Sequence, residues 1–313
     1  MRRILLFALG LTLCASSHSF ASSDYAGELL SLGVGARAAG MGNAFVAVSN
    51  DASASYWNAA GLSLLGRSEA LLMHAERFAG LVNYNLVSYA RPLQQEAGLG
   101  VLVFRLGIDG IKYTELEDPG EPLSAANRPR VKRTASSADY VVYLAYGRRL
   151  RERLSLGGSA KLIRRKIGDN TAFGYGVDVG LLYLLGPVSV GLNLRNLTSS
   201  PVHWDTGTMD RILPSVDFAV AYTQPIAILG SKLTGTIGTY QDKDFSGLNG
   251  ADALNLGLEC KHSDALAVRI GSTLGKLTAG LGLRFYDRAG VDYAFSQHRQ
   301  LGNSHRLSVS LWL

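Results

Sequence analysis

The sequence lacks any long apolar run after residue 21, whereas a helix needs about 20 consecutive apolar residues to cross a bilayer. Membrane-spanning helices are therefore not expected in that part of the chain. Cysteine is nearly absent: Cys14 lies in an N-terminal leader and Cys260 is left alone, so no intramolecular disulfide is expected. The net charge of +6 is too mild, and too little interleaved with aromatic residues, to indicate nucleic-acid binding.

Catalytic and metal-binding motifs are also missing. The histidines after residue 21 show no H-E-x-x-H spacing, and the sequence has no G-x-S-x-G elbow. Segment 33–38 fits the dinucleotide pattern G-x-G-x-x-A only superficially, because no strand–helix–strand pattern surrounds it. A lipase-like serine–histidine pair remains the enzymatic alternative, since such pairs meet in space and not in sequence. We therefore expect a protein that is not an enzyme and has no cofactor or metal site.

What the sequence has instead is alternation of apolar and polar residues, with the period of two that a strand imposes. The last nine residues set an apolar face against a mostly polar one: Leu307, Val309, Leu311 and Leu313 against Arg306, Ser308, Ser310 and Trp312. Ending on such a strand is typical of outer-membrane barrels, where the last strand pairs with the first. The mean hydropathy of +0.11, with 36 glycines and 14 tyrosines, agrees with the weak, distributed apolar signal of such a barrel.

Counting these segments predicts an all-β fold, a roughly fourteen-stranded antiparallel transmembrane β-barrel, with the even strand number of single-chain bacterial barrels. The expected strands are 69–75, 82–91, 98–108, 138–147, 153–166, 174–185, 188–197, 215–223, 232–241, 253–261, 265–273, 277–286, 290–297 and 305–313.

Short and long connections between these strands alternate. Short turns are expected at 148–152, 186–187, 262–264 and 287–289, and long polar connections at 109–137, 198–214, 242–252 and 297–304. With both ends of the chain in the periplasm, this alternation places the long connections outside the cell. A soluble periplasmic β-sandwich or barrel is the alternative, because its strands also alternate, but a sandwich needs no terminal strand signal.

The N-terminus carries an export signal. Two arginines precede an apolar core at 4–13, and residues 19–21 form a small-x-small cleavage signal. We expect residues 1–21 to be a cleaved signal peptide, and the mature chain to reside in the bacterial outer membrane. Lipoprotein processing at Cys14 is the alternative, but the bulky Leu13 occupies the position where a small residue is expected.

The polar faces of the expected strands carry charges of both signs. Because an unpaired charge buried in a lumen is costly, we expect opposite charges there to pair or to contact water. The charged residues expected to face the lumen are Lys161, Asp178, Arg195, Asp217, Glu259, Arg269, Arg284 and Asp292.

Residues 22–66 differ from the alternating remainder. They contain the runs Gly35-Ala36-Arg37-Ala38-Ala39-Gly40-Met41-Gly42 and Asp51-Ala52-Ser53-Ala54-Ser55-Tyr56-Trp57-Asn58-Ala59-Ala60-Gly61-Leu62. These runs closely resemble the amino-terminal signature of the PorV/PorQ family, within the wider FadL-like group of outer-membrane transport barrels. The chain departs from the family pattern at Ala59, where proline is usual.

The resemblance implies an outer-membrane barrel over residues 67–313, with residues 22–66 folded into its lumen as a hatch. Packing and turn formation are the simpler role for the motif, and ligand binding is the other. The hatch residues that the resemblance marks as binding or structural are Arg37, Gly40, Met41, Gly42, Asn43, Asp51, Trp57, Asn58 and Gly61.

The resemblance leaves two functions open. The main expectation is a PorV-type barrel for type IX-like secretion, which binds or shuttles secreted cargo proteins or secretion-machine subunits at the outer membrane. Its partner site would lie in the loops 109–137 and 198–214, where the basic run 128–133 would also meet outer-membrane lipid and lipopolysaccharide. The alternative is a FadL-like channel for hydrophobic solutes, which strand 98–108 supports because both of its faces are apolar.

Overall fold

The computed structural model describes residues 27–77, 80–94, 96–226, 230–239, 254–263, 265–297 and 302–313. The expected signal peptide, residues 22–26 of the expected hatch, the connection 242–252 and His298 lie outside the described residues. Among the described residues, no helix is both long and apolar enough to cross a membrane.

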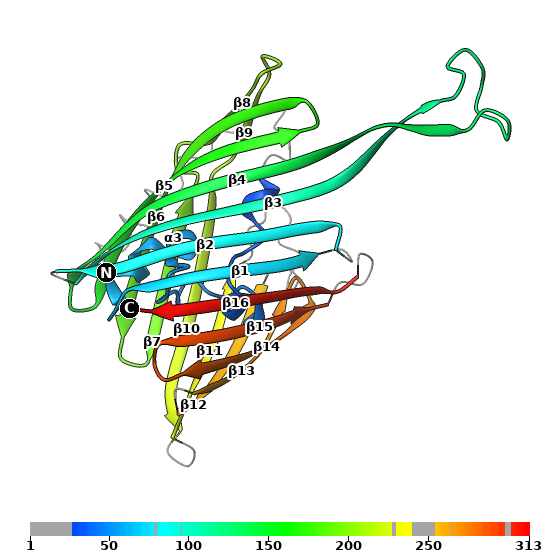
Figure 1. Ribbon diagram of the computed structural model, residues 1–313. Helices are drawn as coiled ribbons and strands as arrows, with labels where there is room; N and C mark the ends of the chain where they lie inside the picture. Colours follow the sequence, from blue (N-terminus) through cyan, green and yellow to red (C-terminus); the bar gives the residue numbers. More distant parts are fainter. Residues whose placement is uncertain are drawn as a thin grey trace.

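Fourteen strands form a closed antiparallel barrel (Figure 1). Each pairs with the next, and the last pairs with the first, with Trp312 opposite Glu69. This confirms the predicted all-β, fourteen-stranded transmembrane barrel. The strands are β1 (Glu69–Arg77), β2 (Val82–Leu93), β3 (Ala97–Leu116), β4 (Pro129–Arg151), β5 (Leu154–Ile167), β6 (Asn170–Leu185), β7 (Val188–Arg195), β10 (Ser215–Ile226), β11 (Ser231–Thr239), β12 (Leu254–His262), β13 (Leu266–Thr273), β14 (Lys276–Phe285), β15 (Ala289–Ser296) and β16 (Ser304–Trp312).

The connection between β3 and β4 is more ordered than the sequence suggested. β3 continues to Leu116 and β4 begins at Pro129, so most of the expected loop 109–137 is a two-stranded arm that projects beyond the barrel (Figure 1). The register between the two strands shifts after Ile108 and again after Tyr113. These irregularities break the alternation from which strands are predicted, because each extra residue moves the side chains that follow to the other face.

The expected loop 198–214 also contains strands, β8 (Ser200–Trp204) and β9 (Met209–Ile212), which form a hairpin. β8 pairs with β6, and the side chains of Val202 and Ile212 are buried. They belong to the same apolar cluster as Leu29 and Leu30, so the hairpin covers the first described residues of the hatch.

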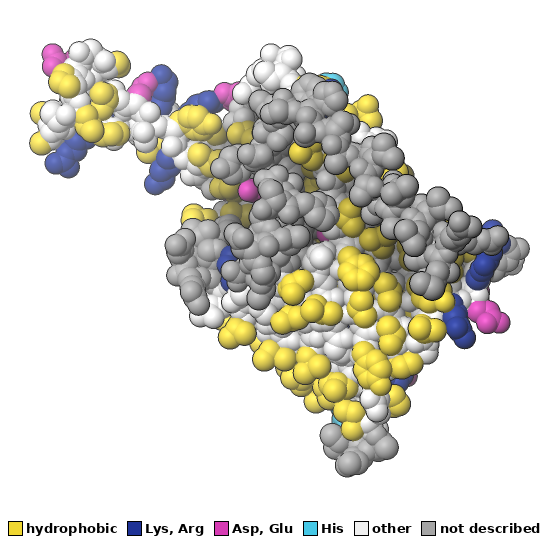
Figure 2. All heavy atoms as spheres, turned by 180° about the vertical axis from the view of Figure 1, so that it is seen from behind, with side chains coloured by type: hydrophobic (Ala, Val, Ile, Leu, Met, Phe, Trp, Pro, Cys, Tyr) yellow, Lys and Arg dark blue, Asp and Glu magenta, His cyan; other side chains and the backbone are white. Residues whose placement is uncertain are grey.

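The two faces of the wall differ as alternation requires. The outward Leu256 and Ile270 are 47% and 55% exposed, whereas the inward Asn255 and Arg269 are each 2% exposed. Figure 2, which views the molecule from behind, shows hydrophobic side chains spread over the outer wall. So large an apolar surface is unusual for a protein in water and is expected of a wall in contact with lipid.

Aromatic residues on β6 indicate how thick this apolar wall is. The outward Phe173 and Tyr183 lie near the two ends of the strand. At a rise of about 3.3 Å per residue and a strand tilt of about 45°, their separation corresponds to about 23 Å of membrane thickness. This agrees with the apolar band of ~25 Å that outer-membrane barrels present to lipid.

The residues before β1 occupy the lumen. Four short helical segments lie there: η1 (Glu28–Leu30), α2 (Ala36–Gly40), α3 (Ala54–Trp57) and η2 (Ala59–Leu64). α2 packs against β13 to β16, and η2 packs against β2 to β6. The hatch therefore bridges opposite parts of the wall.

Small residues on the inner wall let the hatch approach it closely. A Cβ added at Gly271 would lie 2.4 Å from the backbone nitrogen of Gly42, so only glycine fits there. The same nitrogen donates a hydrogen bond to Thr278 Oγ1 at 3.1 Å. The inward row that receives the hatch crosses β11 to β14 with one residue per strand: Thr236, Gly257, Gly271 and Thr278.

We predict that Gly271→Val destabilises the barrel by roughly 1–3 kcal/mol, because the hatch backbone against it must shift. The matched control Gly235→Val lies two strands away and faces outward into an apolar hollow of about 580 Å³. The nearest heavy atom to a Cβ there is 3.9 Å away, and we expect a change below about 0.5 kcal/mol. Urea unfolding in lipid vesicles measures both, and equal effects would contradict docking of the hatch on this row.

Candidate functional site

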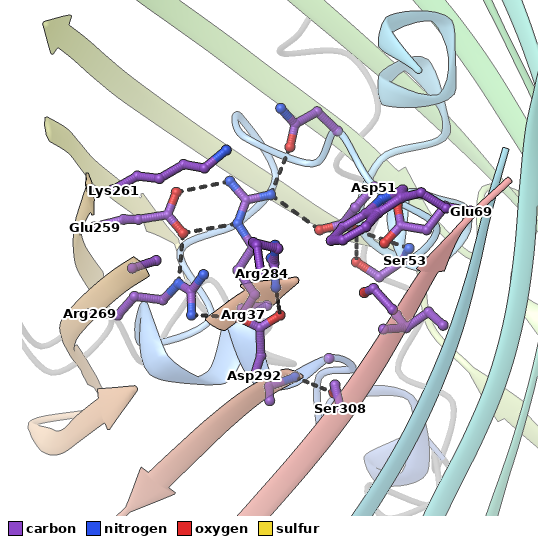
Figure 3. A pocket seen from close by; sticks show the side chains of 18 of the residues that line it. Arg37, Asp51, Ser53, Glu69, Glu259, Lys261, Arg269, Arg284, Asp292 and Ser308 are labelled. Atoms are coloured by element: carbon purple, nitrogen blue, oxygen red, sulfur yellow. Dashed lines mark hydrogen bonds and ion pairs between the residues drawn. The ribbon is translucent and has the colours of Figure 1, made fainter. Parts of the chain in front are cut away.

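Arg37 of α2 is the centre of an ion-pair network that joins the hatch to the wall (Figure 3). Its Nε and Nη2 donate to the two carboxylate oxygens of Glu259, each at 3.0 Å. Its Nη1 donates to Asn50 Oδ1 at 2.7 Å and to Asp51 Oδ2 at 3.2 Å. One guanidinium group therefore ties α2 to β12 and to the hatch segment that leads into α3.

The network continues along the inner wall from Glu259. Arg269 Nε donates to Glu259 Oε2 at 2.6 Å, and Arg269 Nη1 donates to Asp292 Oδ1 at 2.8 Å. Arg284 Nη1 donates to the other oxygen of Asp292 at 2.9 Å. These side chains come from β12, β13, β14 and β15, so the network spans four adjacent strands as well as the hatch.

Electrostatics keeps Arg37 charged. Burial by itself would lower the pKa of Arg37, because it disfavours the charged form. The charge and hydrogen bonds of Glu259 and the charge of Asp51 more than offset this, and hold the pKa of Arg37 above its ordinary value. The contact between hatch and wall is thus a charge-assisted, bidentate pair, the stronger kind of hydrogen bond.

Two cavities flank Arg37, and their linings include residues of the strand ends and turns near the C-terminus, such as Trp312 and Pro187. Their volumes are about 370 and 340 Å³. Arg37, Asn50, Glu259 and Lys261 line both of them. We call these two cavities the vestibule. Since their shared lining is polar or charged, the vestibule suits water and polar groups.

A second charged group lies on the other side of the lumen. Lys161 Nζ lies 2.6 Å from Asp178 Oδ1, and the two side chains are 0% and 3% exposed. Arg195 Nε lies 2.5 Å from Asp217 Oδ2, and the Arg195 guanidinium also stacks 4.4 Å from the ring centre of Tyr56. Each of the eight charges expected in the lumen thus forms an ion pair with another of the eight.

A continuous series of aromatic contacts crosses the buried part of the lumen. It joins the wall strands β2, β3 and β4 to the hatch, with ring-centre separations of 5.3, 6.4, 5.9, 5.0 and 5.9 Å. The guanidinium carbon of Arg37 lies 5.1 Å from the ring centre of the last member, so the series ends at the ion-pair network. We call it the aromatic chain; its members in order are Tyr84, Phe104, Tyr143, Tyr56, Trp57 and Phe45.

Solved structures share this arrangement of barrel strands. The chain is similar to the Pseudomonas putida toluene transporter TodX, with 13% identity and a TM-score of 0.57 over 90% of this chain and 98% of that one. The Ralstonia pickettii toluene transporter TbuX has 10% identity and a TM-score of 0.58, covering 90% and 97%. A Pseudomonas aeruginosa FadL homologue has 12% identity and a TM-score of 0.51, covering 87% and 96%.

The chain shares the fold of these three barrels. No protein-family model and no curated protein matches the sequence. At identities of 10 to 13% these likenesses show the fold alone. The finer resemblance of the hatch motif to the PorV/PorQ family is therefore taken up below as a proposal.

In this barrel, the first motif run forms the turn that meets the inner wall. Gly40, Met41, Gly42 and Asn43 follow one another there, and Gly42 and Asn43 both have a φ of 60°. Thr278 Oγ1 lies 3.3 Å from the carbonyl oxygen of Gly40 and donates to it. These residues shape and anchor the hatch, and none of them lines the vestibule.

The second motif run holds the hatch together. Asp51 Oδ1 accepts from the backbone nitrogen of Ser53 at 2.9 Å, and Trp57 Nε1 donates to a hatch carbonyl at 3.0 Å. Asn58 Nδ2 donates to the carbonyl of Leu181 in the wall at 3.0 Å. A Cβ at Gly61 would lie 1.7 Å from a backbone oxygen of the hatch, so this position accepts only glycine. The Asn58 turn forms here although alanine follows it.

Sequence reasoning missed several residues that hold the hatch. Arg306 Nη1 donates to the carbonyl oxygens of Gly33 and Gly35 at 3.2 and 3.4 Å. Ser308 Oγ accepts from the backbone nitrogen of Ala36 at 2.9 Å. Both residues were expected on the polar face of the last strand, but alternation alone does not indicate which inward residues meet the hatch.

Proposed function

We propose that the chain is an outer-membrane channel for small hydrophobic solutes, delivered to the membrane by the signal peptide expected over residues 1–21. The observation that carries this proposal is the aromatic chain: six rings, each at most 4% exposed, lead from the wall to the hatch. The toluene transporters TodX and TbuX share its fold, which supports the same class of solute for this chain.

The aromatic side chains of this part of the lumen favour apolar solutes over polar ones. An apolar ring moved from water to such surroundings gains about 25 cal/mol per Å² of buried surface, and offset or edge-on contacts with aromatic side chains add to that. A charged or strongly hydrated solute would lose its water there without matching partners. The vestibule has the opposite character, so the two regions would treat a solute differently.

Uptake of radiolabelled toluene by intact cells tests the proposal. Cells are needed because phospholipid vesicles are themselves permeable to toluene, whereas the lipopolysaccharide leaflet slows it. In a strain that lacks other hydrocarbon channels, we expect the chain to accelerate uptake and Phe104→Asn to reduce that gain about tenfold, because it places an amide in the aromatic chain.

The matched control is Phe218→Asn, on the outward face of β10, where the side chain is 43% exposed. It should leave toluene uptake unchanged. If cells with the wild-type chain take up toluene no faster than cells without it, the chain is not a channel for this solute class. Equal loss in both variants would mean that the aromatic chain is not the route.

A second candidate function is secretion-associated protein binding of PorV type. The hatch motif and the β3–β4 arm support it. The arm extends beyond the barrel on the side away from the C-terminus (Figure 1). It exposes Tyr113 and Val131, at 39% and 53%, and leaves two strand edges unpaired near its tip. Exposed edges and apolar side chains of this kind suit contact with another polypeptide.

Crosslinking in intact outer membrane, followed by mass spectrometry, tests this candidate. The variant replaces residues 110–134 by a short Gly-Ser turn, which removes the arm and leaves the barrel strands intact. Recovery of exported proteins or secretion-machine subunits with the wild-type chain, lost in the shortened one, would support it. Recovery of neither, together with normal toluene uptake by the shortened chain, would leave only the transport function.

A further inference from the structure

A row of cationic and aromatic side chains crosses the outer wall where the arm leaves the barrel. The register aligns one residue from each of β3, β4, β5 and β6, in the order Arg105, Tyr140, Arg164 and Phe173. Arg105 Nε donates to Tyr140 Oη at 3.2 Å, and the guanidinium of Arg164 lies 5.8 Å from the ring centre of Phe173. Lys166 follows Arg164 on the same face of β5, about 7 Å further along the strand.

Two of these cations form no ion pair within the described part of the chain, although Lys166 is near enough to Asp169 to interact with its charge. Arg164 and Lys166 are both exposed, and the described ion pairs include neither of them. The nearby Asp169 and Asp139 are taken by other arginines, at 2.7 and 3.1 Å. Two adjacent positive charges on one strand repel each other unless an anion joins them.

The basic run in the arm, where the sequence suggested contact with lipopolysaccharide, is a poorer candidate. Arg130 pairs with Glu117, Lys132 with Glu115 and Arg133 with Asp169. These pairs lie on the projecting arm and its base, and neutralise one another. Arg128, the remaining basic residue of the run, donates to the carbonyl oxygen of Ala125 at 3.0 Å and lies on the projecting arm, whereas Arg164 and Lys166 lie on the wall.

The side chains next to this row identify the kind of anion. One step toward the C-terminal end of the barrel, the outward row is Val103, Val142, Leu162 and Tyr175, of which Leu162 is 63% exposed. A ligand that contacts both rows must carry an anionic head directly above an apolar tail. At the outer ends of β11 to β14 the outward row is Ile237, Leu256, Ser272 and Leu277, which has no charge. The wall formed by β11 to β14 thus has no such row at this position.

We propose that Arg164 and Lys166, flanked by Tyr140 and Phe173, dock the phosphate groups of a lipopolysaccharide molecule whose acyl chains lie against the apolar row beneath. Arginine binds phosphate through paired hydrogen bonds and lysine binds it as a point charge. The aromatic rings lie at the height where amphipathic rings favour the boundary between lipid and water. The site lies on the outer surface and is independent of solute passage through the lumen.

Native mass spectrometry of the purified barrel in detergent tests the site with two probes, lipopolysaccharide and its dephosphorylated form. For the R164Q/K166Q double variant we expect retention of lipopolysaccharide to fall roughly tenfold or more, since each basic residue near an anionic lipid contributes separately. The wild-type barrel should hold the dephosphorylated probe as weakly as the variant holds the intact one.

The matched control is R151Q/R153Q, which removes two exposed arginines from the turn at the other end of β4 and β5. It should retain lipopolysaccharide like the wild type. All four residues are exposed, and heat-modifiable migration in gels checks that each variant is a folded barrel. Equal retention of lipopolysaccharide by R164Q/K166Q and the wild type, or an equal loss in R151Q/R153Q, would overturn the proposal. So would binding of the dephosphorylated probe by the wild type as tightly as it binds the intact one.

Discussion

Replacing Lys161 by methionine is expected to lower the free energy of unfolding by about 3–5 kcal/mol. The change keeps the length and apolar stem of the side chain but removes its charge. Among the described residues, Asp178, whose side chain is 3% exposed, then keeps the backbone nitrogen of Asn196 as its one remaining hydrogen-bond partner, at 2.7 Å. A buried carboxylate that loses its ion-pair partner must either stay charged in a poorly solvating site or take up a proton, and both are unfavourable. Urea unfolding in lipid vesicles measures the loss.

The matched control is Lys132→Met, because Lys132 forms an ion pair with Glu115 on the arm, where the two side chains are 61% and 45% exposed. An exposed pair is screened by water and salt, so this change should cost less than about 1 kcal/mol. The double variant K161M/D178N removes both buried charges but keeps an acceptor for Asn196, and should recover more than half of the loss. Equal costs for K161M and K132M would mean that water reaches the Lys161 pair and that this part of the lumen is not dry.

The barrel strands were readable from the sequence because their signal is local. An outward side chain such as Leu258 contacts lipid and its neighbour Glu259 faces the interior. The alternation of apolar and polar residues within each strand therefore reflects these two environments. The arm broke that rule. Beyond Ile108 neither face of β3 or β4 is buried, and the register shifts twice, so the period of two is lost although the strands continue.

The candidate site was readable only in part, because its contacts join distant segments. Arg37 was marked by its motif and Glu259 by its inward position, but 222 residues separate the two in sequence. Their contact depends on the closure of the barrel and on where the hatch rests against it. The pairing of Lys161 with Asp178 likewise follows from the register of β5 and β6, which a single sequence does not fix.

The aromatic chain could not be predicted from the sequence either. Phe104 and Tyr143 were expected on strands, and Trp57 in the hatch, but no periodicity links residues from three wall strands to a lumen segment. Contacts of this kind are set by the depth at which the hatch packs. That depth depends on inward glycines such as Gly271 as much as on the rings themselves.

The second large effect is expected from Arg37→Glu, which should loosen the hatch and let ions pass through the lumen. A glutamate at this position would face Glu259 and Asp51, the two carboxylates that Arg37 now binds at 3.0 and 3.2 Å. Like charges brought together in this way cost several kcal/mol. Since each 1.4 kcal/mol changes an equilibrium tenfold, the open fraction of channels should rise by about tenfold or more. Single-channel recording in planar bilayers measures it.

Two variants separate the loss of this contact from a general effect of charge. Arg37→Lys keeps the positive charge and gives up only the paired hydrogen bonds, so its channels should stay closed nearly as often as in the wild type. Arg67→Glu makes the same charge reversal in a residue that lines the same cavity. Arg67 instead contacts the carbonyl of Asp287, in the turn between β14 and β15, and stacks 4.7 Å from the ring of Trp312 in β16. It should therefore leave the hatch in place.

The comparison also decides what closes the lumen. If R37E conducts and R67E does not, the barrel is closed by a hatch whose hold on the wall depends on charge. Phe45, the last ring of the aromatic chain, would then lose its contact with the Arg37 guanidinium when the hatch leaves the wall. If R37E is folded and remains closed, the backbone contacts of Gly42 with Thr278 and of Ala36 with Ser308 suffice to hold the hatch. Solute passage would in that case require the aromatic side chains to move within a fixed hatch.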